Sequence, residues 1–266
     1  MSSTQELLRR INSVATMKQI TQTMKFVAVA KLAKTKIDME RILKYKKQLL
    51  DIIQETFILQ PIDVTQDKDL MISISSDKGF CGAFNNNICK RTKEFLQKHT
   101  NNIDVIAVGK KINMFLSKHG YKSVFKDLFG HYSLEALQNF ANEVTDKYNS
   151  YRNIYFIYNG YNQNNNDVYK IPHYELIKKD TSTTLLDQDS TITTYVLLKK
   201  MLVVDIMSIV IESIAQENNT RMVSMSKATD NAEVLEKSLR ISYNQLRQAT
   251  ITNEIMEITN GAMTLK

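Results

Sequence analysis

Three polar side chains near the end of the chain, Arg247, Gln248 and Thr252, stand out as a candidate binding cluster. The stretch that holds them, SYNQLRQATITNEI (242–255), contains neither glycine nor proline, so nothing in it ends a helix. Arginine presents a planar fork of donors that suits carboxylates, and an amide and a hydroxyl add further hydrogen-bonding groups. None of the three could abstract a proton or attack a phosphate. The cluster predicts a contact surface, and the alternative is a plain solvated helix face.

A second candidate is the stretch SISSDKGFCG, which ends a β-rich run in a turn with two glycines and the thiol of Cys81. A phosphate-binding loop needs GxGxxG or GxxxxGK[ST], and Gly79-x-x-Gly82 fits neither pattern. Cys81 could be a nucleophile beside a histidine in space, but no local signature supports this. We interpret the stretch as a tight strand-to-helix turn that needs backbone freedom. The sequence therefore predicts no catalytic residue and no cofactor.

Cysteine and histidine spacing gives no metal site. The two cysteines, Cys81 and Cys89, have no metal-ligand pattern around them, and no histidine pair has the HExxH spacing. The four histidines are His99, His119, His131 and His173. We expect no bound metal and two reduced thiols in a non-oxidising compartment.

The formal net charge of +7 predicts an acidic partner surface. Residues 1–60 carry eleven Lys and Arg against five Asp and Glu, whereas residues 192–266 carry eight of each. Nucleic acid, an anionic membrane face and an acidic protein are the possible partners. Residues 1–60 hold only Phe26, Tyr45 and Phe57 for base stacking, so we expect no nucleic acid.

No apolar run reaches the roughly 20 residues that span a bilayer. The longest candidate, MLVVDIMSIVI (201–211), is interrupted by Asp205 and reads as a buried helix. The start, MSSTQELLRR, has no apolar segment after it and is not a secretory signal. A removed transit peptide remains an open alternative.

Helix-breaking residues divide the chain into three segments. Residues 1–60 and 173–260 hold neither glycine nor proline, whereas the middle holds nearly all the turn chemistry. We predict an N-terminal coiled-coil helix at 1–60, a central α/β domain at 61–190 and a C-terminal coiled-coil helix at 191–266. In the middle, strand-like runs such as DLMISI and IDVIAVG alternate with helical ones, which predicts a mostly parallel sheet. The expected fold class is α/β, with a long antiparallel coiled coil and an inserted Rossmann-like domain.

Apolar spacing predicts the face through which the two arms pair. We expect early residues of the first arm to lie beside earlier positions of the second. The first arm has apolar residues at Leu7, Ile11, Val14, Ile20, Met24 and Val27. The second has a predicted seam at Met225, Ala228, Ala232, Leu235, Leu239, Ser242, Leu246, Ala249, Asn253 and Met256.

Three stretches together resemble the gamma subunits of F-type ATP synthases, in the right order and over essentially the whole chain. They are TMKQITQTMKFVAVAKL (16–32), SSDKGFCGAFNNNI (75–88) and RMVSMSKATDNAEVLEKSLRISYNQLRQATITNEIMEI (221–258). The resemblance implies two terminal helices inside a ring of alternating alpha and beta subunits. It also implies a central domain that meets a delta- or epsilon-type stalk subunit and the c-ring.

The resemblance also implies contact residues. Arg247, Gln248 and Thr252 would meet a loop of one catalytic beta subunit, and Met24, Lys25 and Lys78 would lie near an acidic segment of beta. The implied role is a non-catalytic rotor whose asymmetry cycles three catalytic sites, with all nucleotide held by the beta subunits.

Two alternatives remain open at this point: a diverged rotor of a repurposed motor, and a nucleotide-using enzyme built on the central domain. The implied location is peripheral, on the inner face of a bacterial plasma membrane or the matrix face of a mitochondrial inner membrane.

Overall fold

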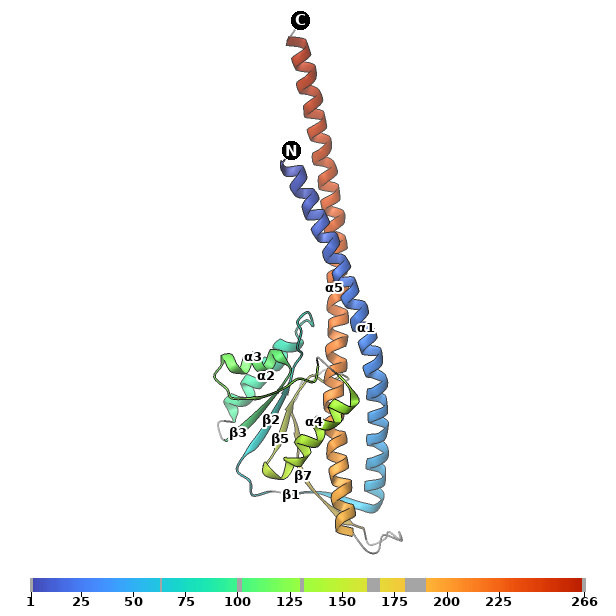
Figure 1. The fold of residues 1–266 in the computed structure, drawn as a ribbon, viewed down its shortest axis with the longest axis vertical. Coiled ribbons are helices and arrows are strands. Elements are labelled where there is room, and N and C mark those ends of the chain that lie inside the picture. Colours follow the sequence, from blue (N-terminus) through green and yellow to red (C-terminus); the bar gives the residue numbers. More distant parts are fainter. Residues whose placement is uncertain are drawn as a thin grey trace. The chain divides into compact units, whose positions relative to one another are not determined.

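The computed structural model describes residues 2–62, 64–99, 102–129, 132–161, 168–179 and 190–264. Two compact units are formed (Figure 1). Unit 1 consists of residues 1–28 and 222–266, and unit 2 consists of residues 29–221. This division is based on contacts between residues and does not test the three segments that we predicted from the sequence. Those segments therefore stay a prediction.

Two long helices account for both ends of the chain. Helix α1 runs over Ser2–Thr56 and helix α5 over Ser190–Thr264. Because α1 and α5 hold no proline and only one glycine, close to the end of α5, nothing interrupts their hydrogen-bond ladders. The predicted class, long terminal helices around an inserted sheet domain, is confirmed.

The helices of unit 1 pair in an antiparallel manner. Lys18 Nζ lies 3.4 Å from a carboxylate oxygen of Glu233, and the hydroxyls of Thr21 and Thr229 are 2.9 Å apart. Further along, Lys25 Nζ donates to Ser226 Oγ at 3.1 Å. Residue numbers thus rise on α1 as they fall on α5. Our expectation that early residues of the first arm meet earlier positions of the second was wrong, since antiparallel pairing requires the opposite.

The face of α5 that packs on α1 differs in part from the predicted seam. One row of its buried and half-buried residues follows an alternating spacing of four and three. The row consists of Met225, Thr229, Ala232, Glu236, Leu239, Tyr243, Leu246 and Thr250, and residues 222, 224, 226, 228 and 233 are half-buried beside it. Of the predicted seam, Leu235, Ser242, Ala249, Asn253 and Met256 are exposed. The apolar pattern placed five of its ten residues on this face, at 225, 228, 232, 239 and 246. It missed the others because half of the positions in the row are polar or amphipathic.

The matching face of α1 is also partly polar. It consists of Leu7, Ile11, Val14, Lys18, Thr21, Lys25 and Ala28. Ile20 and Val27, which we expected to pack, are 55% and 52% exposed. We call the paired groups Lys18, Thr21 and Lys25 of α1 with Ser226, Thr229, Glu233 and Glu236 of α5 the polar seam. Hydrogen bonds and ion pairs connect the helices there, beside apolar residues such as Ile11 and Met225 that are buried in the same unit.

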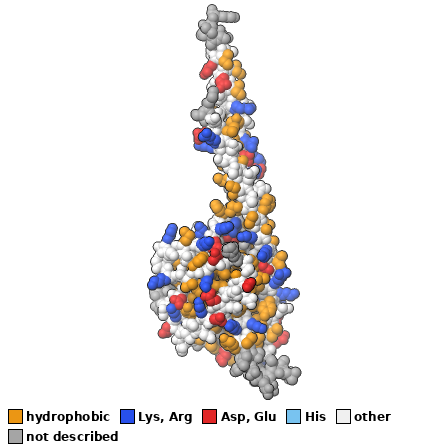
Figure 2. Space-filling model, viewed as in Figure 1, with side chains coloured by type: hydrophobic (Ala, Val, Ile, Leu, Met, Phe, Trp, Pro, Cys, Tyr) orange, Lys and Arg blue, Asp and Glu red, His pale blue; other side chains and the backbone are white. Residues whose placement is uncertain are grey.

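Those outward side chains form a set that we call the outer apolar residues. On α1 they are Met17, Ile20, Phe26 and Val27, and on α5 they are Val223, Val234, Leu235 and Ile241. Figure 2 shows hydrophobic side chains, in orange, along the helices of unit 1. Helix α5 also continues past the first residue of α1 (Figure 1), and Ile251, Ile255 and Ile258 are exposed there. Unit 1 therefore combines a partly polar contact between its helices with several large apolar side chains on its surface.

A disulfide across the polar seam should form within one chain. Because the Thr21 and Thr229 hydroxyls are 2.9 Å apart, Thr21→Cys with Thr229→Cys should oxidise readily without dimer formation, as judged by non-reducing gels and intact mass. The control is Thr21→Cys with Tyr243→Cys, displaced along α5 by roughly 21 Å at 1.5 Å per residue. Crosslinks found only between chains would show that unit 1 pairs between molecules instead.

Unit 2 contains a five-stranded sheet in the order β4-β3-β2-β5-β6. The strands are β2 (Asp69–Ile74), β3 (Ile103–Val108), β4 (Val124–Lys126), β5 (Ile154–Ile157) and β6 (Val168–Ile171). The first four in spatial order are parallel and β6 is antiparallel, which agrees with the predicted mostly parallel sheet. Strand β2 is buried along its whole length, as a central strand covered on both faces should be.

Helices and a short 3-10 turn complete this α/β domain. They are α2 (Phe84–Lys98), α3 (Lys110–Lys118), α4 (Leu134–Asp146) and η1 (Tyr148–Ser150). The main core joins Met71 and Ala107 of the sheet with Ile88 of α2 and Leu116 of α3. These residues thus pack helices α2 and α3 against the sheet.

A separate two-stranded ribbon was not expected. Strand β1 (Phe57–Ile62) pairs antiparallel with β7 (His173–Lys178), so residues 57–60 are strand where we predicted helix. Helix α1 ends at Thr56 because aromatic and β-branched residues follow it and Pro61 cannot continue a helix. The run NGYNQNNND (159–167) predicts a hairpin or exposed loop, and residues 162–167 of this run lie outside the described residues.

The same two long helices also pair inside unit 2, but through a largely apolar face. Leu32, Met39, Ile42, Leu49 and Ile53 of α1 are buried there. Lys46 Nζ lies 2.9 Å from Asp205 of α5, which keeps the antiparallel direction. The pair is therefore packed through more apolar side chains in unit 2 than in unit 1, where the polar seam adds hydrogen bonds and ion pairs.

Candidate functional site

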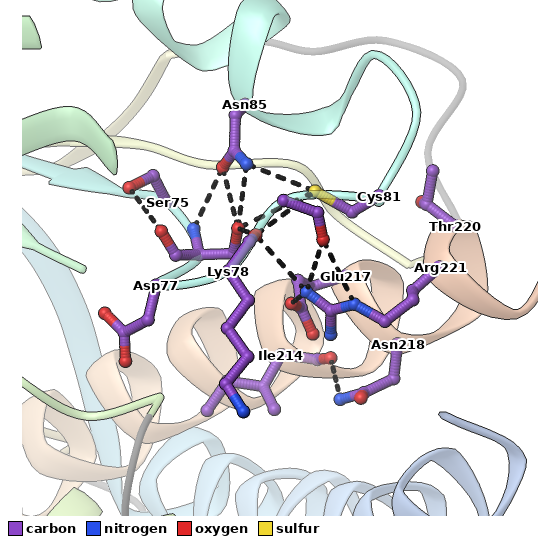
Figure 3. Close-up of polar contacts among 12 residues, drawn as sticks. Ser75, Asp77, Lys78, Cys81, Asn85, Ile214, Glu217, Asn218, Thr220 and Arg221 are labelled. Carbon is purple, nitrogen blue, oxygen red and sulfur yellow. Dashed lines mark hydrogen bonds and ion pairs between the residues drawn. The ribbon is translucent and has the colours of Figure 1, made fainter. Parts of the chain in front are cut away.

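The turn between β2 and α2 is fastened to α5 by one arginine (Figure 3). We call residues 75–82 the Lys78 turn. The Arg221 guanidinium donates to the backbone oxygen of Lys78 at 3.3 Å and to that of Gly79 at 3.3 and 3.4 Å. The helix thereby holds the backbone of the turn and leaves the Lys78 side chain exposed.

Arg221 is itself held by Glu217, one helical turn earlier on α5, through an ion pair. The Arg221 side chain is 12% exposed and that of Glu217 only 5%. Burial raises the pKa of Glu217, and the charge and hydrogen bond of Arg221 act against that rise. Sequence reasoning missed this pair, although a glutamate four residues before an arginine on a helix was a visible signal.

Internal hydrogen bonds complete the Lys78 turn. Ser76 Oγ donates to the Lys78 carbonyl at 2.6 Å, and Asn85 Nδ2 donates to Ser76 Oγ at 2.8 Å and to Cys81 Sγ at 3.1 Å. Cys81 is buried, and the neighbours of its sulfur here are polar groups of this same network. The thiol thus has the surroundings of a structural cysteine and not those of a nucleophile.

The start of α3 supports the other side of the turn. Asp77 accepts the backbone N–H of Lys110 at 2.9 Å, and burial raises the pKa of Asp77. Gly109 is required because it has φ +94° and a Cβ there would lie 2.1 Å from the Ser75 oxygen. The strand ends, α3 and α5 thus all constrain one short turn.

A cavity of about 270 Å³ lies beside this turn. Its lining includes the cationic residues Lys31, Lys34, Lys78 and Arg221 as well as the acidic residues Asp77 and Glu217. The surplus of positive charge around it fits an acidic surface better than a cation. Within the described ranges, no group of three histidine, cysteine or acidic side chains could hold a metal ion.

The usual ligand position of a doubly wound sheet is filled by the protein's own side chains. Such folds bind ligands at the carboxyl ends of strands where the strand order reverses, here between β2 and β5. Arg91 donates to Tyr158 O and Asn159 Oδ1, each at 3.3 Å, and Asn159 Nδ2 donates to Phe84 O at 3.1 Å. Asn159 is buried in that position, so its amide and the Arg91 guanidinium occupy this end of the sheet.

The other predicted contact residues lie in unit 1, at two places. Arg247, Gln248 and Thr252 are exposed on α5, off the face that packs on α1, and Thr252 Oγ1 donates to Gln248 O at 2.9 Å. Met24 and Lys25 are half-buried on α1, and Lys25 is bonded to Ser226. From Ser226 to Arg247 is roughly 31 Å along α5 at 1.5 Å per residue. The two groups therefore lie at separate places along unit 1, and Lys78 belongs to unit 2.

No helix in the described parts of the chain combines the length and the apolar character that crossing a membrane requires.

Comparison with known proteins places this arrangement in one family. The family model described as ATP synthase matches residues 3–265. The ATP synthase gamma chain of Amoebophilus asiaticus is 33% identical, with 100% of this chain and 99% of that protein covered. The gamma chain of Flavobacterium johnsoniae is 32% identical, with 100% and 99% covered.

Solved structures show the same fold. A chain in the cryo-EM structure of the Euglena gracilis mitochondrial ATP synthase, OSCP/F1/c-ring, aligns with a TM-score of 0.66 at 19% identity, covering 99% of this chain and 94% of that one. A chain of the Tetrahymena thermophila mitochondrial central stalk/c-ring structure aligns with a TM-score of 0.57 at 18% identity, covering 79% and 99%.

The chain belongs to the ATP synthase family. Its relatives within that family are gamma chains. Its role is that of a stalk subunit, the central-stalk rotor of an F-type ATP synthase.

Proposed function

We propose that unit 1 turns inside a ring of alternating alpha and beta subunits and sets the conformation of the catalytic sites on beta. The observation that carries this proposal is the surface of unit 1, which exposes several large apolar side chains. Its helices meet through a mixed face that includes the polar seam, and the outer apolar residues and the Arg247 cluster face outward. A lone helical pair in water would bury more of its large apolar side chains, because burying apolar area is the main stabilising term. Such a surface suits a shaft enclosed by other subunits.

In this proposal, Arg247, Gln248 and Thr252 hydrogen-bond to a loop of one beta subunit. Met24, Lys25 and Lys78 lie toward an acidic segment of beta, which supplies the partner of the basic first arm. Support comes from the exposure of Lys78 and the Arg247 cluster, since exposed donors held on rigid elements are available to a partner. Each rotor angle would thus favour a different state of each beta subunit.

The chemistry of ATP synthesis and hydrolysis would belong to beta alone. Ion flow would turn the shaft in one direction for synthesis, and ATP hydrolysis would turn it in reverse. The α/β domain of unit 2 would sit against a delta- or epsilon-type subunit and the c-ring. This assembly would place the chain at the inner face of a bacterial plasma membrane or the matrix face of a mitochondrial inner membrane.

The isolated chain should bind no ATP. The filled crevice between β2 and β5 and the missing phosphate-loop pattern both motivate this expectation. Calorimetric titration of the purified chain with Mg-ATP should give only heats of dilution, whereas alpha and beta subunits titrated in the same buffer should bind. Stoichiometric binding to the isolated chain would favour the rival, a nucleotide-using enzyme.

A further inference from the structure

Phe80, in the Lys78 turn, is unusual in two respects at once. Its φ is +63°, the only positive value for a non-glycine residue in the described part of the chain. Its side chain is also 68% exposed. The aromatic ring therefore gains little burial from the fold of this chain, although the backbone beneath it is in a disfavoured conformation.

The conformation is costly for this residue type. The left-handed region brings Cβ close to the backbone carbonyl, and asparagine, aspartate and above all glycine adopt it more readily than bulky side chains. Strained residues of this kind persist where their surroundings impose the conformation, and they concentrate at functional sites. Phe80 has glycine neighbours at 79 and 82, so the chain places glycine beside the strained position but not in it.

The surroundings of Phe80 do impose its conformation. On one side, Arg221 and Ser76 hold the carbonyls of Lys78 and Gly79. On the other, Cys81 is 2% exposed and fixed by Asn85. Phe80 spans two anchored points, so its ring is directed outward by contacts that other residues make.

We propose that Phe80 is a docking residue that acts together with Lys78. Its ring would enter an apolar site on the partner, and the Lys78 ammonium two residues earlier would meet carboxylates beside that site. Lys31 and Lys34 at the nearby cavity add positive charge, and Asp77 is occupied by the Lys110 N–H, so the surface suits an acidic partner with an apolar centre. This inference rests on the proposed function, in which the Lys78 turn faces the acidic segment of beta.

The test is the variant Phe80→Gly, which should maintain or raise the stability of the free subunit but lower ATP hydrolysis by the assembled complex. Glycine relieves the left-handed strain, so thermal unfolding of the free subunit should stay at the wild-type temperature or rise. ATP hydrolysis by the complex reconstituted with alpha and beta subunits should fall at least about fivefold, since large aromatic anchors carry much of an interface's energy. A merely structural Phe80 would give no loss of activity.

Two further variants and a crosslink make the outcome decisive. Phe80→Leu keeps an apolar side chain and should retain most of the activity, whereas Met114→Ala, which removes another exposed apolar side chain from unit 2, should change nothing. A benzoylphenylalanine introduced at position 80 should capture a beta subunit on illumination, and one at position 114 should not.

Failure of the inference and failure of the proposed function give different results. If wild type does not assemble with alpha and beta subunits, the proposed function fails. If wild type assembles and Lys78→Ala lowers activity, but Phe80→Gly matches wild type and position 80 captures no beta subunit, only the Phe80 inference is overturned.

Discussion

Replacing Arg247 and Gln248 together by alanine is expected to lower ATP hydrolysis and ion-driven synthesis by the assembled complex tenfold or more. Hydrogen bonds to charged groups contribute about 1.5–3 kcal/mol each. Each 1.4 kcal/mol lost from a transition state is about tenfold in rate. The free subunit should keep its helicity, because both side chains are exposed and lie off the packed face of α5. Rates of the reconstituted complex and circular dichroism of the free subunit measure the two effects.

The matched control is Asn244→Ala with Gln245→Ala, which removes two other exposed polar side chains from the same helix. This control should leave both rates within about twofold of wild type, as surface changes away from a contact usually do. Wild-type rates for the Arg247 and Gln248 variant would mean that the cluster is only a solvated face. Loss of helicity would mean that it supports the helical pair.

Arg221→Ala is expected to destabilise unit 2 by about 3–5 kcal/mol, because it leaves the buried Glu217 carboxylate without its partner. It also removes the hydrogen bonds to the Lys78 and Gly79 carbonyls. For a unit of this size the loss corresponds to a fall of roughly 6–20 °C in unfolding temperature. Thermal unfolding of the free subunit, followed by calorimetry, measures it.

Two controls separate the buried charge from the loss of any ion pair. Lys90→Ala breaks an exposed pair with Glu94 on α2 and should cost no more than about 1 kcal/mol. Arg221→Met with Glu217→Leu removes both charges and should cost clearly less than Arg221→Ala alone. Equal losses in Arg221→Ala and in this double variant would assign the effect to the turn's hydrogen bonds instead of the unpaired carboxylate.

The overall architecture could be predicted from the sequence because tertiary contacts rarely override the effect of glycine and proline on where helices end. Arms without glycine or proline became α1 and α5, and alternating runs became β2, α2, β3 and α3. The strand β1 could not be predicted from local pattern, since its partner strand, β7, lies more than 100 residues away. Pairing of that kind depends on chain topology and not on the six residues themselves.

The face through which α1 and α5 pack in unit 1 was predicted less completely, and the reason is physical. Met225, Ala232 and Leu239 were placed correctly, but the positions between them are held by Thr229 and Glu236, whose partners are polar groups on α1. Hydrophobic periodicity cannot find a face built from hydrogen bonds. The roles of Glu217 and Arg221 were missed as well, because they depend on backbone carbonyls some 140 residues earlier in the chain. By contrast, Arg247 and Gln248 are exposed and lie off the packed face, as we expected, and their contact role stays a prediction.

The topology of unit 1 also has a consequence for biosynthesis. The Thr21 hydroxyl meets a residue 208 positions later in the chain. At 5–20 residues per second, the first helix would leave the ribosome roughly 10–40 s before its partner exists. During that interval Met17, Ile20, Phe26 and Val27 lie on a helix that has neither its neighbour nor an enclosing ring. Co-translational assembly and chaperone binding should therefore involve the first thirty residues of this protein more than its α/β domain.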